Sequence, residues 1–117
     1  MPELFVRGRD EPLARRVERA VTFRTRLVGL LGRERLAPDE GLWIEPCDSI
    51  HTFFMRFPID VAFVDGRGVV LRVLAAVPPW RATRVHARAR ACVELAAGTL
   101  QKAGVEAGSK LSLGRPP

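Results

Sequence analysis

Tyrosine is absent from the 117-residue chain, and cysteine, histidine and lysine occur only twice each. Two cysteines without CxxC spacing, Cys47 and Cys92, are too few for a disulfide scaffold, so a reducing compartment is expected. No apolar run approaches the roughly 18 residues needed to span a bilayer. The opening Met1-Pro2-Glu3 does not resemble a basic-then-apolar export signal. These absences predict a cytoplasmic protein with no membrane partner.

Apolar residues, by contrast, are plentiful. Hydrophobic residues make up 47% of the chain and charged residues 27%, with a mean hydropathy of +0.02. This composition excludes global disorder, which requires far fewer apolar groups. Area scaling indicates that roughly two-thirds of the surface is buried on folding. The sequence therefore predicts one domain over residues 1–117, with a core at about residues 13–113 and frayed ends at residues 1–11 and 114–117.

Arginine dominates the charged residues. The formal net charge is +6, and every basic residue except Lys102 and Lys110 is arginine. A positive field attracts polyanions, but an arginine bias also arises in a GC-rich genome, and both explanations stay open. Tyrosine is missing and phenylalanine clusters in apolar runs. The sequence therefore shows no interleaved aromatic platform of the kind that single-strand nucleic-acid-binding proteins use.

Local patterns predict mainly β structure with one short helix. Thr22 can cap a helix over residues 23–31, where apolar residues recur at helical spacing before Gly32. Residues 13–21 suit a helix or a strand. Further strands are expected at residues 42–44, 49–56, 59–64, 69–74 and 108–113, with a hairpin turn at residues 65–68 and a helical turn at residues 98–103.

The clearest pattern is an alternation of apolar and polar residues over residues 84–95. Apolar side chains at odd positions alternate with mostly basic ones at even positions, which is typical of a strand with one buried and one solvated face. Arg84, His86, Arg88 and Arg90 would then lie in a row about 6.6 Å apart. Their neutralisation by Glu94 and Glu18 would be incomplete, so weak, salt-sensitive binding of polyanions is a further hypothesis.

Three sequence blocks resemble one known family. Residues 20–33 read AVTFRTRLVGLLGR, residues 51–65 read HTFFMRFPIDVAFVD, and residues 94–98 read ELAAG. In this order they resemble the DUF192 family of uncharacterised bacterial and archaeal proteins, over residues 17–111. The resemblance implies a single-domain β-sandwich or closed barrel, with one short α-helix after a first strand at residues 13–21. It implies no activity, because none is assigned to the family.

Two sets of residues are candidates for binding. Trp80 lies after Pro78-Pro79 in an expected loop, and a large aromatic beside polar groups is typical of small binding grooves. Trp80 could equally plug one end of a barrel. The ligand-binding candidates are His51, Phe54, Met55, Arg56, Asp60, Trp80 and Glu94. The anion-binding candidates, which could instead form a solvated face, are Arg81, Arg84, Arg88 and Arg90.

Catalytic and metal chemistry find less support in the residue spacing. Cys47, His51 and Met55 are of types that bind soft metals, but in an extended segment His51 would lie roughly 13 Å from each of the others. Ser49 and His51 would lie about 6.6 Å apart on one strand, too far for a nucleophile and its base. We therefore expect no metal and no cofactor. A cross-strand pair of Cys92 with His51 or His86 stays open.

The remaining acids of the β region are Asp48, Asp60, Asp65 and Glu94. Two facing carboxylates could share a proton, but a turn position for Asp65 and an arginine partner for Glu94 are the simpler expectation. The prediction is a non-catalytic domain that binds a small ligand or a partner protein. A small hydrolase with a cross-strand Cys or Ser and His pair is the alternative.

Overall fold

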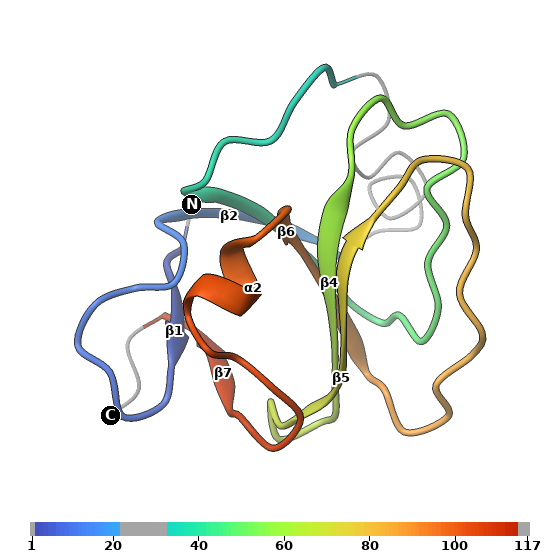
Figure 1. Ribbon diagram of the computed structural model, residues 1–117. Coiled ribbons are helices and arrows are strands. Elements are labelled where there is room, and N and C mark those ends of the chain that lie inside the picture. Colours follow the sequence, from blue (N-terminus) through green and yellow to red (C-terminus); the bar gives the residue numbers. More distant parts are fainter. Residues whose placement is uncertain (1, 22–32, 115–117) are drawn as a thin grey trace.

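The computed structural model describes residues 2–21 and 33–114 (Figure 1). The predicted helix at residues 23–31 lies outside the described residues. One short helix is described, α2 (Thr99–Lys102), at the helical turn expected near residues 98–103. The strands are β1 (Leu4–Val6), β2 (Arg16–Ala20), β3 (Glu40–Ile44), β4 (Ile59–Val64), β5 (Val70–Val77), β6 (Ala91–Ala96) and β7 (Leu111–Leu113).

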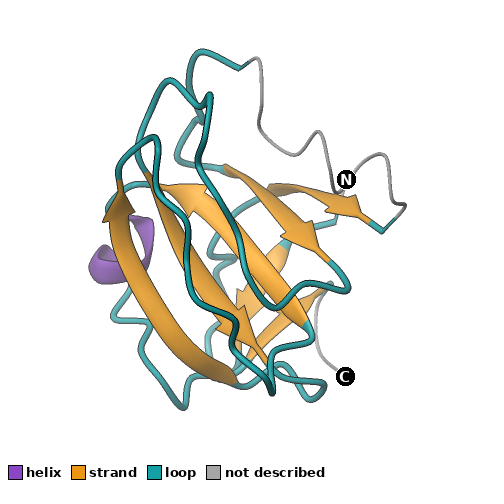
Figure 2. Cartoon of the chain, turned by 90° about the vertical axis from the view of Figure 1, so that its right-hand side faces the viewer, coloured by secondary structure: helices purple, strands orange, loops and turns teal. Residues whose placement is uncertain are grey.

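The strands form two sheets. The larger has the order β2-β3-β6-β4-β5, with β2 and β3 parallel and the other neighbours antiparallel. The smaller pairs β1 with β7, the first and last strands of the described chain. Figures 1 and 2 show the larger sheet running across the molecule with α2 beside it. Neither sheet closes among the described strands, so the closed-barrel alternative is wrong and the arrangement is sandwich-like.

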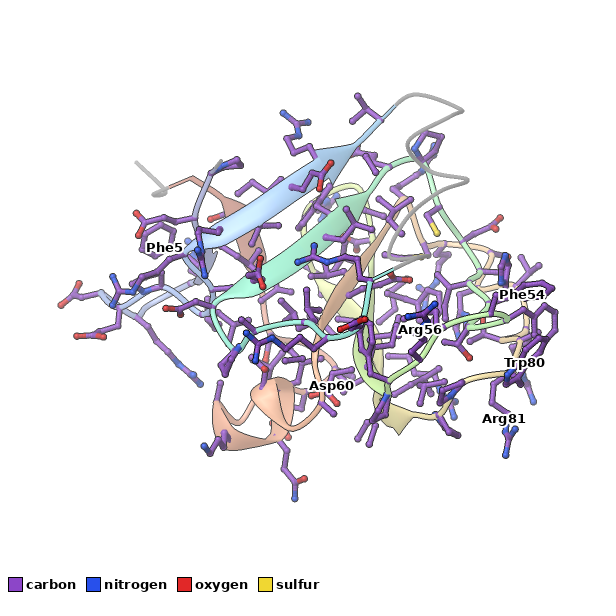
Figure 3. All side chains as sticks on the ribbon, turned by 90° about the horizontal axis from the view of Figure 1, so that it is seen from above. Phe5, Phe54, Arg56, Asp60, Trp80 and Arg81 are labelled. Atoms are coloured by element: carbon purple, nitrogen blue, oxygen red, sulfur yellow. The ribbon has the colours of Figure 1, made fainter. Side chains whose placement is uncertain are left out.

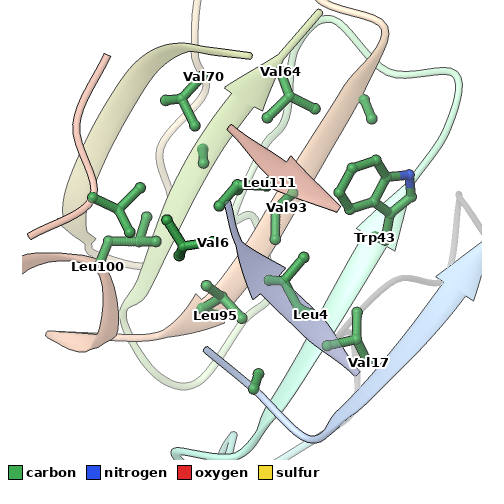
Figure 4. Close-up of a cluster of buried hydrophobic side chains, with 14 residues drawn as sticks. Leu4, Val6, Val17, Trp43, Val64, Val70, Val93, Leu95, Leu100 and Leu111 are labelled. Carbon is green, nitrogen blue, oxygen red and sulfur yellow. The ribbon is translucent and has the colours of Figure 1, made fainter. Parts of the chain in front are cut away.

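Two apolar clusters cover the two faces of the larger sheet. The first lies between the sheets, where Leu4 and Leu111 pack with Val93 and Leu95 of the central strand β6 (Figure 4). The second lies on the opposite face and includes Ile44, Ile59, Val61, Phe63 and Cys92. Loop residues such as Leu36, Ile50, Met55 and Ala89 complete it. Strand β6 is therefore buried on both faces, which explains why all its residues but Ala96 are buried.

Short-range signals predicted the β4–β5 hairpin correctly. Residues 59–64 form β4 as expected, and Oδ1 of Asp65 accepts hydrogen bonds from the backbone N–H groups of Arg67 (2.8 Å) and Val69 (3.0 Å). Gly68 has φ +82°, and a Cβ there would lie 2.3 Å from the carbonyl oxygen of Leu111. Only glycine fits this turn without displacing β7.

Two predictions about the chain outside this hairpin are wrong. Residues 1–11 were expected to fray, but Leu4–Val6 is a strand whose three side chains are buried, because β7 supplies its hydrogen-bonding partner. Residues 49–56 were expected to form a strand. They form a loop in which His51 makes one isolated bridge to Ala82, so this segment pairs with another loop instead of a sheet.

The predicted strand over residues 84–95 is only half correct. Residues 91–96 form β6, but residues 84–90 form a loop in which Val85 is 61% exposed. His86, expected on the solvated face, instead stacks on Phe63 with ring centroids 4.0 Å apart. The expected division into one buried and one solvated face therefore fits neither segment. Strand β6 has no solvated face, and residues 84–90 have no strand partner. The predicted basic row on one strand does not exist.

Candidate functional site

Two loops meet at one end of the larger sheet. The first, residues 45–58, follows β3, and the second, residues 78–90, follows β5. Thr52, which is fully buried, joins them: its Oγ1 donates to the carbonyl of Pro78 (2.7 Å) and accepts from the N–H of Arg81 (2.9 Å). Its backbone N–H donates to the carbonyl of Arg81 (2.8 Å), and its carbonyl accepts from the N–H of Trp80 (2.9 Å). Thr52 was not a candidate from the sequence, yet it fixes both loops.

These hydrogen bonds bring four aromatic rings together on the surface. The aromatic cluster consists of His51, Phe53, Phe54 and Trp80. Ring centroids lie 5.2 Å apart between His51 and Phe53, 6.1 Å between Phe53 and Trp80, and 4.7 Å between Phe54 and Trp80. Phe54 is 69% exposed and Trp80 is 56% exposed. Trp80 therefore does not plug one end of the fold, and its loop presents the ring to solvent.

The backbone at the cluster is strained. Phe54 has φ 67° and Trp80 has φ 66°, in the left-handed region that residues other than glycine and asparagine seldom occupy. Each such residue costs on the order of 1–2 kcal/mol. Exposed rings recover little of that cost through burial. Backbone strain and exposed aromatic side chains at the same place make this surface the candidate functional site.

Arginines flank the aromatic cluster. Figure 3 shows Phe54, Trp80 and Arg81 together at one end of the molecule, far from Phe5. Arg81 is exposed, and its guanidinium donates to the carbonyl of Trp80 at 3.4 Å. Arg56 makes an exposed ion pair with Glu34, at 3.7 Å. The other anion-binding candidates, Arg84, Arg88 and Arg90, are exposed and make no ion pair with any described residue.

The remaining ligand-binding candidates lie in the interior, apart from this surface. Met55 is buried in the second apolar cluster. Asp60 is fully buried, and its carboxylate accepts from the backbone N–H groups of Ala76 (2.9 Å) and Leu100 (3.0 Å). Glu94 is buried between Leu42 and Val61, its neighbours in register, and burial raises its pKa to about 7. The expected arginine partner of Glu94 is not found among the described residues.

The described part of the chain holds no pair suited to nucleophilic catalysis. Nδ1 of His51 accepts from the N–H of Phe53 at 3.3 Å, and both ring nitrogens of His86 are buried without a hydrogen-bond partner. Cys92 and Ser49 therefore contact neither imidazole by a hydrogen bond. No group of three or more His, Cys, Asp or Glu side chains suited to a metal ion occurs in residues 2–21 and 33–114. No helix in these ranges is long and apolar enough to cross a membrane.

Comparison with known proteins identifies the family. The family model DUF192, described as "Uncharacterized ACR, COG1430", matches residues 5–113. The chain belongs to this family. The resemblance drawn from the three sequence blocks is thereby confirmed. Comparison with curated proteins gives no significant match.

Two crystal structures share the fold of this DUF192 protein. One is a protein of unknown function from Novosphingobium aromaticivorans DSM 12444, with a TM-score of 0.82, 22% identity, and coverage of 94% of this chain and 83% of that one. The other, from Sinorhizobium meliloti 1021, is described as "a putative transcription regulator". Its TM-score is 0.81 and its identity 25%, with coverage of 95% and 92%. Both support the fold over nearly the whole chain.

Proposed function

We propose that this protein is a non-catalytic binding module and that its aromatic cluster holds single-stranded nucleic acid. The observation that carries the proposal is the pair formed by Phe54 and Trp80, two exposed rings 4.7 Å apart on strained backbones. The two rings are tilted by 59° to each other, and each keeps an exposed surface on which a base can stack, a contact worth about 1–3 kcal/mol per base. On this proposal, the aromatic platform that the sequence did not show would be assembled from two loops.

Charge favours a nucleic acid over an uncharged ligand such as a carbohydrate. The net charge is +6, and Arg81 and Arg84 follow Trp80 in the same loop, where no described acid pairs with them. Exposed arginines close to stacked bases can contact the phosphates between those bases. The same geometry implies that binding is strongly salt-dependent and has little sequence preference, since nothing in the cluster reads base edges.

Two further considerations bear on the proposal. The name of the Sinorhizobium relative points to a role in transcription for that protein, which agrees with a nucleic-acid partner here. The hydrolase alternative receives no support from the described residues, since neither histidine lies in hydrogen-bond contact with a thiol or hydroxyl. A cytoplasmic location remains part of the proposal, because a nucleic-acid partner is available there.

Fluorescence anisotropy of a labelled oligo-thymidine tests the proposal. We expect binding at low salt that weakens steeply as the salt concentration rises, because bound phosphates release counterions. Trp80→Ala or Phe54→Ala should weaken binding about tenfold, the effect of losing one stacked base. Arg81→Ala combined with Arg84→Ala should also flatten the salt dependence.

Two substitutions outside the proposed contacts serve as matched controls. Val85 is an exposed apolar residue of the same loop, so Val85→Ala should leave binding unchanged. Arg72 is exposed on the edge strand β5, and Arg72→Ala should leave the salt dependence unchanged. Absence of binding at low salt would refute the proposal, as would a Trp80→Ala variant that binds as tightly as the wild type.

A further inference from the structure

The two cysteines are distant in sequence but lie close together at the base of the two loops that carry the candidate site. Cys47 follows β3 in the turn that opens the first loop, and Cys92 lies in the central strand β6. Ile44 pairs in register with Cys92, and the N–H of Cys47 donates to the carbonyl of Arg90 at 3.0 Å. Cys47 packs against the second apolar cluster, which contains Cys92, and its Sγ donates to the carbonyl of Ser49 at 3.1 Å. Neither cysteine is disulfide-bonded.

The environments of the two thiols differ. Cys47 is only partly buried and lines a surface hollow together with Pro46, Asp48, Ala87, Ala89 and Arg90. Cys92 is fully buried among Phe63 and its neighbours of the second apolar cluster. The neighbouring thiol of Cys92 lowers the pKa of Cys47, whereas the thiol of Cys47 and burial raise the pKa of Cys92. Cys47 is thus the thiol that solutes can reach, and its pKa is the lower of the two.

We propose that Cys47 and Cys92 form a peroxide-reactive thiol pair that closes to an intramolecular disulfide. The thiolate of Cys47 attacks one oxygen of hydrogen peroxide, so that an S–O bond forms, the O–O bond breaks and hydroxide leaves to become water. The sulfur of Cys92 then attacks the sulfenic acid of Cys47. An S–S bond forms, the S–O bond breaks, and a second water leaves with the proton of Cys92. Two thiols and one peroxide give one disulfide and two waters.

The position of this bond links it to the two loops. Cys47 precedes His51, Phe53 and Phe54 in the first loop. Cys92 is the second residue of β6, the strand that follows the loop carrying Trp80. A disulfide would therefore join the base of the first loop to the central strand. Formation of this disulfide removes conformational freedom from the unfolded chain, so the oxidised protein should unfold at a higher denaturant concentration. This inference does not depend on what the aromatic cluster binds.

Thiol counting and peptide mapping test the inference on the full chain. Reduced protein treated with hydrogen peroxide, under conditions that oxidise free glutathione, should lose both thiols, remain a single chain, and yield one peptide pair that links Cys47 to Cys92. In Cys92→Ala, Cys47 should stop at sulfenic acid and react with dimedone. In Cys47→Ala, the buried Cys92 should keep its thiol.

Three results would overturn the inference. They are a wild-type protein that keeps both thiols, a disulfide found only between two chains, and a Cys47→Ala variant that oxidises as fast as the wild type. Circular dichroism melts of both variants establish that they are folded before they are compared. If Cys92→Ala does not fold, the peptide map of the wild-type protein decides alone.

Discussion

The carboxylate of Asp60 joins two elements that are distant in sequence, because one oxygen accepts the N–H of Leu100 (3.0 Å) and the other the N–H of Ala76 (2.9 Å). Leu100 lies in the short helix α2, and Ala76 lies near the end of β5 with φ 48°. Asp60 is fully buried, so its carboxylate relies on these two N–H groups in place of water. Asp60 therefore stabilises the fold, although the sequence had suggested it as a ligand-binding residue.

Replacement of Asp60 should be costly. Asp60→Ala removes two charge-assisted hydrogen bonds and leaves two N–H groups without an acceptor, so we expect a loss of about 3 kcal/mol in unfolding free energy. Asp60→Asn keeps one acceptor oxygen and should cost about 1 kcal/mol. Urea titration measures both variants. A loss below about 0.5 kcal/mol for Asp60→Ala would contradict this role.

Glu94 should make stability depend on pH. Burial raises its pKa from 4.5 to about 7, so the folded protein holds this proton more tightly than the unfolded chain does. The contribution of Glu94 to the unfolding free energy is therefore fully present below pH 4.5 and is lost as the pH rises to about 7, by roughly 3 kcal/mol. Glu94→Gln should lack this decline. Denaturant titrations of both proteins at acid and alkaline pH test it, and parallel pH profiles would contradict it.

The strain at Phe54 predicts an unusual order of stabilities. Phe54→Ala and Phe54→Gly both remove the ring, but only glycine adopts φ 67° without a steric penalty. We expect Phe54→Gly to be about 1 kcal/mol more stable than Phe54→Ala. At Phe53, where φ is not positive, the order should reverse, since glycine costs more backbone entropy. Thermal or urea unfolding of the four variants measures both differences, and the same order at both positions would refute the strain.

The parts of the fold that the sequence predicted well depend on neighbours in the chain. The hairpin turn needs only Asp65 and Gly68 at fixed offsets, and β4 is an apolar run interrupted only by Asp60. The aromatic cluster depends instead on Thr52, whose hydrogen bonds join loops that lie far apart in sequence. No local pattern encodes such a contact. The alternation at residues 84–90 misled for the same reason, because loop packing and not a sheet decides which of those side chains are buried.

The buried ring nitrogens of His86 lower the stability of the fold, and a substitution can remove this cost. Its ring stacks on Phe63 with centroids 4.0 Å apart, and both ring nitrogens are buried without a hydrogen-bond partner. An unsatisfied buried polar group costs about 1–3 kcal/mol, whereas a phenylalanine ring would keep the stacking and bury no polar atom. We therefore expect His86→Phe to raise the unfolding free energy by about 1 kcal/mol.

The larger phenylalanine ring has to fit the space that the imidazole fills, so His86→Leu serves as a second variant of different shape. A gain in either variant supports the role of the unsatisfied nitrogens, since neither replacement adds a hydrogen bond. His51→Phe is the matched control, because the imidazole of His51 is exposed and its Nδ1 already accepts from the N–H of Phe53. This control should gain nothing in urea titrations. If both His86 variants lose stability, the imidazole contributes to folding through a contact that phenylalanine and leucine cannot replace, and the predicted cost of the buried nitrogens is wrong.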